Sequence, residues 1–489
     1  MANDAFRQPI VDGIQEELSR KKKRGTQRGA LWRFPPAVFA LLFAVTASAV
    51  NASSEETYDF RPDLKPDSFQ QVQAVVEVRG DLLVEGGDGE RQKMPIVVSG
   101  KVTYDERLLA AQDGGTRRSV RHYREAAAEV KVGQGLVTPH LNPQRRLLVA
   151  QIEDGEATLF SPLGPLTRDD LELVDIQGNS LALSGLLPRQ AVRVGESWEL
   201  DGGLLAILLG LDTITRNDVR GTLEPLDGST AVLTIEGSLE GAAEGVVSKI
   251  ELKAKLNFDL TRRAVTWLAA NFRERREISH GEPGFDVTAR LRLAIAPQTN
   301  AETLSDQALR ALPLSATAGA TLLQLSPQKS FFRLIHDRRW RVMLDRHDLC
   351  VLRCVDRGDL LAQGNISELA DAEPGKRLAL EGFQAEVLDS LASSAGQIAE
   401  ASQETSDDGL RILRVQATGI TSEIPIVWIF YHLSNEQGRQ AAMSFTLASD
   451  AQQRFAEGDR TLVESFEFTP RPQPQEAKRT DRASPKPRS

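Results

Sequence analysis

The chain has 489 residues, of which 41% are hydrophobic and 26% are charged, and this ordinary globular composition excludes a fibrous, collagen-like or wholly disordered protein. Acidic residues outnumber lysine and arginine by 68 to 59, and the formal net charge is −9. This balance argues against nucleic-acid binding, because a protein that neutralises phosphates needs a basic surface.

Residues 1–52 have the order of an export signal: a basic stretch, a short apolar run at 37–45, and then small residues. This pattern predicts cleavage after Ala49 or Ala52. If the segment is not cleaved, residues 34–50 would form a membrane anchor near the lower limit of about 17 to 25 residues that span hydrocarbon. In both interpretations the folded part is extracytoplasmic, either periplasmic or secreted, and any membrane association runs through this segment.

Alternation of apolar and polar residues dominates 58–297 and predicts strands with one buried face and one solvated face. Such strands are typical of an antiparallel sheet. We therefore predict one large antiparallel β domain over this range. The clearest alternating stretches are 72–78, 97–104, 231–235, 249–260 and 287–295.

Two interruptions of this pattern predict helices. Thr167 followed by Asp170 is a capping-type start for a short helix. The run 204–209 is apolar at every position between Gly203 and Gly210. A helix that is apolar on all sides must be buried or must cover an apolar surface.

The composition then changes to Ala, Ser, Thr and Leu at 298–320, which predicts a linker with a helical turn around Leu309. A second unit follows at 321–468. A tail at 469–489 is rich in proline and basic residues and is expected to be disordered. The predicted strands of the second unit are 331–335, 341–344, 349–355, 360–366, 410–418, 425–433 and 440–447.

Two helices are predicted beside these strands. The first places Phe383 and Val387 on one face at helical spacing. The second begins at Ser449, whose hydroxyl would cap the helix while Gln452 reaches back. The residues of the second helix expected to point inward are Phe455, Leu462 and Val463.

Residues 424–468 contain IPIVWIFYHLSNEQGRQAAMSFTL, then a polar segment with RFAEGDR, and then LVESFEF. This order resembles the end of a PsbP-like domain, from the superfamily of the extrinsic photosystem II protein and a Ran-release factor. The earlier segment RCVDRGDLLAQGNISEL is similar to bacterial members of the group. The resemblance implies an α/β/α sandwich with an antiparallel sheet over 321–468, and a non-enzymatic adaptor or assembly role.

The first unit loosely resembles the half-barrel of periplasmic lipoprotein carriers, and also exported bacterial β domains that contain VGESW, here at 194–198. The carrier resemblance implies a curved antiparallel sheet closed by helices over an apolar cavity. In that arrangement 204–209 would cover the cavity. Leu204, Leu205 and Leu208 are therefore candidate residues for binding a hydrophobic ligand.

The densest basic segment of the first unit supplies a second set of candidates. On a strand, Arg118, His122 and Arg124 share one face, and Arg117 and Arg121 share the other. Converging guanidinium groups suit phosphate or carboxylate recognition. The ordinary alternative is a solvated strand face whose arginines pair with acidic neighbours.

Catalytic, cofactor and metal sites are not predicted. His336 and His347 lie on different expected strands among many arginines, which disfavours a bound cation. The chain has no G-x-S-x-G elbow. Cys350 and Cys354 lie in a strand-like run, where four residues span about 13 Å, beyond the roughly 7 Å limit for a disulfide. We expect two free, buried cysteines.

The predicted fold is α+β, with a large antiparallel β domain followed by an α/β/α sandwich that has an antiparallel sheet. The favoured function is an exported, non-catalytic binding or scaffold protein of the periplasm or cell envelope, with an unidentified protein or a hydrophobic ligand as partner. Two alternatives stay open: a carrier or chaperone for a hydrophobic ligand or lipoprotein, and a hydrolase without a recognisable motif.

Overall fold

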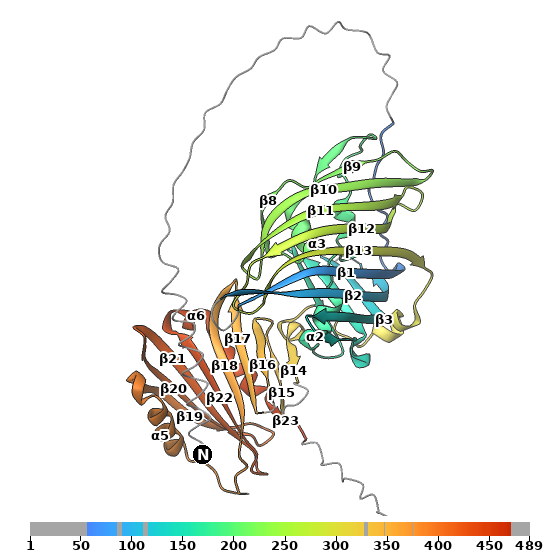
Figure 1. Ribbon diagram of the computed structural model, residues 1–489. Helices are drawn as coiled ribbons and strands as arrows, with labels where there is room; N and C mark the ends of the chain where they lie inside the picture. The colour runs from blue at the N-terminus through green and yellow to red at the C-terminus, as the bar shows by residue number, and fades with distance from the viewer. Residues whose placement is uncertain are drawn as a thin grey trace, which may run out of the picture.

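The computed structural model describes residues 56–470 except 86–89, 111–115, 327–330, 347 and 374. The predicted export segment and all but the first two residues of the predicted tail lie outside the described residues. The described strands form two large antiparallel sheets and one small sheet (Figure 1). The α+β fold class is confirmed: a large antiparallel sheet precedes a second antiparallel sheet that has helices on both faces.

The first sheet has 13 strands in the order β6-β5-β3-β2-β1-β13-β12-β11-β10-β9-β7, with β4 beside β3 and β8 beside β10. Strand β1 pairs with β13, so the first and last strands of the unit meet in the middle of the sheet. The strands are β1 (Phe69–Glu85), β2 (Arg91–Leu108), β3 (Arg117–Val132), β4 (Gly135–Val137), β5 (Leu147–Glu153), β6 (Glu156–Phe160), β7 (Ser197–Glu199), β8 (Thr213–Asn217), β9 (Arg220–Leu223), β10 (Thr230–Ala243), β11 (Val246–Asp259), β12 (Ala264–Arg276) and β13 (Gly284–Gln298).

This sheet curves around the short helices that pack on its concave face (Figure 1). The helices of this unit are η1 (Pro143–Arg145), α2 (Arg168–Val174), η2 (Leu183–Leu186) and α3 (Gly202–Leu209). Helix α2 begins with the predicted capping box, in which Thr167 and Asp170 each accept a backbone hydrogen bond from the other. Helix α3 begins at Asp201, whose carboxylate accepts from the Leu204 amide at 2.9 Å, and ends at Gly210 in the left-handed conformation.

The segment predicted as a linker is instead packed on the convex face of the first sheet. It contains the predicted turn as α4 (Asp306–Leu309), between η3 (Glu302–Leu304) and η4 (Ala318–Thr321). Leu304 and Leu309 are buried against Val120 and Phe160 of the sheet. Its leucines cover an apolar part of the convex face, which composition alone does not reveal.

The second sheet has seven strands in the order β16-β17-β18-β22-β21-β20-β19. Its strands are β16 (Trp340–Asp345), β17 (Leu349–Asp356), β18 (Asp359–Leu369), β19 (Gln397–Thr405), β20 (Arg411–Thr421), β21 (Ile424–Ser434) and β22 (Gln440–Ala448). A three-stranded sheet lies beside it, with β14 (Leu323–Leu325), β15 (Phe332–His336) and β23 (Glu467–Phe468).

Helices cover both faces of the seven-stranded sheet. Helix α5 (Leu380–Ser390) buries Phe383 and Val387 on one face and is followed by η5 (Ala392–Ser394). On the other face, α6 (Gln452–Phe455) and α7 (Gly458–Glu464) pack against β17, β18, β21 and β22. Cys350 and Cys354 are free and buried on this second face of β17, as the strand spacing predicted.

The predicted continuous helix from Ser449 is wrong in detail. The chain forms three pieces, η6 (Ser449–Ala451), α6 and α7, and no side chain caps the first two. Ala456 has a φ of 51° and breaks the helix. Gly458 then packs against the Phe455 ring, where a Cβ would lie 2.9 Å from a ring carbon.

Arginine side chains join the two units. Arg168 of α2 donates to the Arg338 carbonyl at 2.7 Å, and Arg338 donates to the Leu159 carbonyl at 2.6 Å. Arg353 of β17 donates to the His280 carbonyl at 2.9 Å. The acceptor in each of these hydrogen bonds is a backbone carbonyl, so the contacts depend on the course of the backbone and not on the acceptor's side chain. Over the described part of the chain, every helix is too short or too polar to cross a membrane.

Candidate ligand-binding cavity

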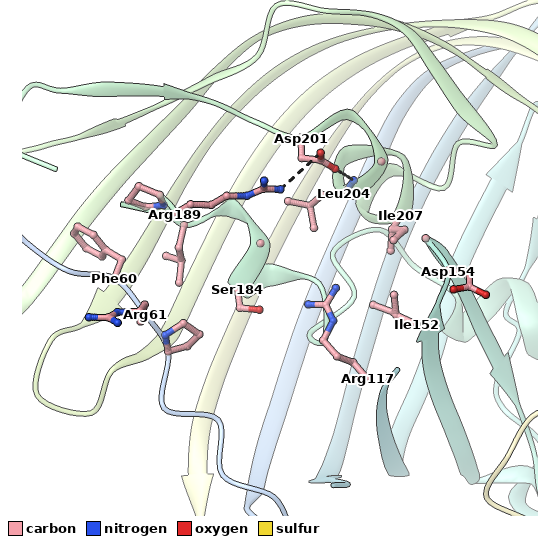
Figure 2. A pocket seen from close by; sticks show the side chains of 16 residues that line it. Phe60, Arg61, Arg117, Ile152, Asp154, Ser184, Arg189, Asp201, Leu204 and Ile207 are labelled. Atoms are coloured by element: carbon pink, nitrogen blue, oxygen red, sulfur yellow. Dashed lines mark hydrogen bonds and ion pairs between the residues drawn. The ribbon is translucent and has the colours of Figure 1, made fainter. Parts of the chain in front are cut away.

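A cavity of about 480 Å³ opens between the concave face of the first sheet and helix α3 (Figure 2). This volume lies within the range of about 300 to 1,000 Å³ that is usual for small-molecule sites. The lining includes Phe60, Arg61, Arg117, Ile152, Asp154, Ser184, Leu187, Arg189, Asp201, Leu204 and Ile207.

Four separate parts of the chain supply the walls. Leu204 and Ile207 come from α3, and Ser184 comes from η2. Arg117 and Ile152 are direct partners in the β3–β5 pair, so their side chains share one face of the sheet. The N-terminal segment contributes Phe60, next to a backbone bridge between Tyr58 and Val192. The walls are therefore largely apolar and come from elements held by the main core.

Charged side chains lie around the mouth of this cavity, and two of the arginines have carboxylate partners. Arg61 lies 2.8 Å from Asp59, and Arg189 lies 3.8 Å from Asp201. Both arginine side chains are largely exposed. Exposed pairs of this kind contribute little to stability, and each carboxylate balances the charge of its arginine.

Arg117 differs from these two arginines. Its side chain is half-buried, and its Nη1 donates to the Leu181 carbonyl at 2.9 Å. Burial lowers the pKa of Arg117, but an arginine remains a cation. No carboxylate forms an ion pair with it among the described residues. Figure 2 shows its guanidinium group pointing into the space between Ser184 and Ile152.

A buried polar network lies on the same face of β3, next to the cavity. Arg121 and Glu106 form an ion pair at 2.9 Å, and Glu106 is completely buried. Ser119, Ser180 and Gln70 also donate to the Glu106 carboxylate. Burial by itself would raise the pKa of Glu106, but the charge of Arg121 and these hydrogen bonds outweigh it and lower the pKa. The network also includes Asn179 and Ser180, which come just before η2, and η2 lines the cavity with Ser184.

The three candidate leucines have different positions. All three are buried in the main core of the first unit, and of the three only Leu204 also lines the cavity. Helix α3 is apolar on all sides, as predicted, and the cavity touches only one of them. The sequence therefore identified the helix but not which of its leucines faces the cavity, and it did not single out Ile207.

The candidates Arg118, His122 and Arg124 lie on the opposite face of β3 from the cavity. Arg118 donates to Ser315 at 2.8 Å and so holds the 298–320 segment. The β2–β3 register is irregular at Arg124, which has no directly opposite residue on β2. The Arg124 side chain forms an ion pair with Asp105 at 2.7 Å. Burial lowers the pKa of the half-buried His122. Arg118 and Arg124 thus bind different neighbouring segments and do not share a partner.

Sequence reasoning missed most of the cavity because its residues come from distant segments. Phe60, Ile152, Ser184 and Arg189 carry no local signal that would connect them. For Arg117 a signal existed, because alternation places it on the same face as the buried aromatic Tyr123. The alternation did not by itself show which face is concave.

The histidines and cysteines among the described residues do not line the cavity. In residues 56–470, outside the gaps given above, no three His, Cys, Asp or Glu side chains are arranged to hold a metal ion. His336 is buried, with a lowered pKa caused by that burial, and His347 lies outside the described residues. Burial raises the pKa of Cys350 and of Cys354 to about 12, so both thiols are protonated at neutral pH.

The sequence matches no protein-family model and no curated protein. Among solved structures, a cyanobacterial PsbP from Synechocystis sp. PCC 6803 is 15% identical, with a TM-score of 0.25, and the match covers 32% of this chain and 99% of that one. A protein of unknown function from Pseudomonas aeruginosa, described as a putative regulator, is 9% identical, with a TM-score of 0.21 and coverage of 31% and 99%.

A lipovitellin structure is 8% identical, with a TM-score of 0.30, and the match covers 49% of this chain and 26% of that one. The chain thus spans about a quarter of the length of lipovitellin.

Proposed function

We propose that this protein is an exported, non-catalytic binding protein whose first unit holds a hydrophobic ligand in the cavity beneath α3. The observation that carries the proposal is the cavity itself, about 480 Å³ in volume and walled by Phe60, Ile152, Leu187, Leu204 and Ile207. Apolar walls around a space of this size favour a small molecule with an apolar part, because its transfer from water is favourable.

The second unit supports a role in attachment or assembly under this proposal. We propose that 321–468 is the PsbP-like unit, since the sequence segments that carry the resemblance form β21, β22, α6, α7 and β23 of the sandwich. A carrier that must deliver its ligand needs a surface for its partner, and this unit would supply it. Its partner is a protein of the periplasm or cell envelope.

Binding is tested with the neutral fluorescent probe N-phenyl-1-naphthylamine and the purified full chain. We expect saturable binding, and we expect Ile207→Glu to weaken it at least tenfold, because a charged side chain would replace part of the apolar wall that the probe contacts. Ile207 is half-buried, so the variant is expected to fold. Ile420→Glu, at an exposed position of the second unit, is the matched control. Absence of binding by folded wild-type protein would refute the proposal.

Export is tested separately by mass spectrometry of the mature N-terminus and by cell fractionation. We expect the folded chain outside the cytoplasm, either beginning near residue 50 or 53 or retaining the segment 34–50. Recovery of the folded protein from the cytoplasm would contradict this part of the proposal.

A further inference from the structure

We propose that the cavity takes a single-chain amphiphile whose oxyanion head, a carboxylate or a phosphate, binds Arg117 while its apolar chain lies against Leu204 and Ile207. This inference rests on the proposed function and names the class of ligand. It depends on the difference between Arg117 and the other arginines of the cavity, and on the division of the lining into a cationic part and an apolar part.

Arg117 is half-buried and has N–H donors that its hydrogen bond to the Leu181 carbonyl does not use. A guanidinium group has five N–H donors, and the single hydrogen bond described for Arg117 goes from Nη1 to the Leu181 carbonyl. A neutral carbonyl does not balance the cation. Burying a charge without a partner is costly, so an anion that enters the cavity would gain an ion pair and fill the unused donors.

The planar arrangement of N–H donors in the guanidinium group determines which anions it binds best. Two parallel N–H donors match the two oxygens of a carboxylate or of a phosphate. The Ser184 hydroxyl lines the same space and adds a possible third donor to the head group. Arg61 and Arg189 already have carboxylate partners, so among the lining arginines the head group would bind Arg117.

Two acidic residues, Asp154 and Asp201, also line the cavity. Figure 2 shows the Asp154 carboxylate directed away from Arg117, and no ion pair joins these two side chains in the described structure. Asp201 is already engaged as the cap of α3 and as the partner of Arg189. Neither carboxylate therefore occupies the place beside Arg117 that the head group would take.

The apolar part of the ligand would lie against the other side of the same space. Leu204 and Ile207 project from α3 toward the cavity, and Ile152 is the cross-strand partner of Arg117. In Figure 2, Ile207 and Ile152 lie to one side of the Arg117 guanidinium group and Leu204 lies above it. The volume of about 480 Å³ lies in the lower half of the usual range for small-molecule sites. It therefore favours one short chain over a lipid with several chains.

The test is isothermal titration of the full chain with five compounds: decanoate, decyl phosphate, decanol, acetate and inorganic phosphate. We expect decanoate and decyl phosphate to bind at least tenfold more tightly than decanol, because hydrogen bonds to a charged group are the stronger kind. Acetate and inorganic phosphate are expected to bind at least a hundredfold more weakly than the corresponding amphiphile. Tight binding of inorganic phosphate would identify the ligand as a free oxyanion and overturn the amphiphile.

The variant Arg117→Gln is expected to remove the preference for the oxyanion while leaving the affinity for decanol within about threefold. Arg117→Lys keeps the charge but not the fork, so a weakened preference is expected. Arg220→Gln, an exposed arginine of β9 outside the cavity, is the control and should change nothing.

The outcomes separate this inference from the proposed function. If decanol and decanoate bind wild-type protein equally well, the inference is wrong and the apolar binding function stands. If none of the amphiphiles nor the neutral probe binds, both fail. The comparison of decanol with decanoate needs only wild-type protein, so it decides the matter even if Arg117→Gln does not fold.

Discussion

The two large sheets of this protein are enclosed to different degrees. The seven-stranded sheet has helices on both faces, and its α6–α7 side is filled by the aromatic residues Trp340, Phe445 and Phe455, whose ring centroids lie 5.7 to 6.4 Å apart. The concave face of the 13-stranded sheet is covered by α3 and short segments, and a cavity of about 480 Å³ stays open beside that helix.

The difference shows that alternating strands lead to two kinds of interior. The α6–α7 face of the seven-stranded sheet is closed by large aromatic side chains, although its two helices have only four and seven residues. On the concave face of the 13-stranded sheet, α3 and its neighbours leave about 480 Å³ unfilled, and this space is available to a ligand. We therefore expect the second unit to be destabilised most by substitutions that remove side-chain volume from its core. We expect the first unit to be destabilised most by substitutions that break its buried polar contacts.

The largest effect is expected from Phe445→Ala in the filled core. Phe445 is fully buried and contacts Trp340, so truncation should cost about 3–5 kcal/mol of unfolding free energy. Phe60→Ala is the matched change at the cavity wall and should cost less, because that ring already borders empty space. Hydrogen exchange followed by mass spectrometry reports the two units separately. Equal losses would contradict the comparison.

A similar loss is expected from Arg121→Met in the first unit. Removal of the guanidinium group leaves the Glu106 carboxylate buried without its ion-pair partner, which costs about 3–5 kcal/mol. The double variant Arg121→Met with Glu106→Gln should recover a large part of this loss, because no unpaired charge remains. Urea unfolding of both variants measures the effect, and a double variant as unstable as the single one would disprove the explanation.

Alanine substitutions of two neighbouring leucines of α3 should have different effects on stability and on probe binding. Leu205→Ala in the core is expected to cost about 2–5 kcal/mol, whereas Leu204→Ala at the cavity should cost less and should instead change the affinity for an apolar probe. Thermal unfolding and probe titration, measured on both variants, separate stability from binding. The reverse pattern would place the open space on the other side of α3.

The smallest expected effect is a pH dependence of the first unit. The pKa of Glu106 is lowered in the folded state, so its contribution to stability is present above the unfolded value of about 4.3 and is lost as pH falls through the folded pKa. Wild-type protein should therefore lose stability more steeply below about pH 4.3 than Glu106→Gln does. Parallel slopes in urea unfolding at pH 3 to 5 would argue against the lowered pKa.

Local patterns predicted the elements whose residues carry a clear signal. The Thr167–Asp170 capping box, the apolar run of α3 and the strand with both cysteines are present as expected. Strand β19 was missed, because it lies at the edge of its sheet and is mostly exposed, so its sequence does not alternate. The break at Ala456 was missed because a positive φ at a residue other than glycine has no clear sequence signal.

The sequence by itself determined what depends on neighbours in the chain: the α+β class, the separation into two sheets, and the apolar character of 204–209. Only the tertiary structure decided which face of β3 is concave, and hence that Arg117 rather than Arg118 lines the cavity. The physical reason is that alternation has a period of two residues and assigns side chains to two faces. The curvature of the whole sheet and the helices that pack on it decide which of those faces encloses a space.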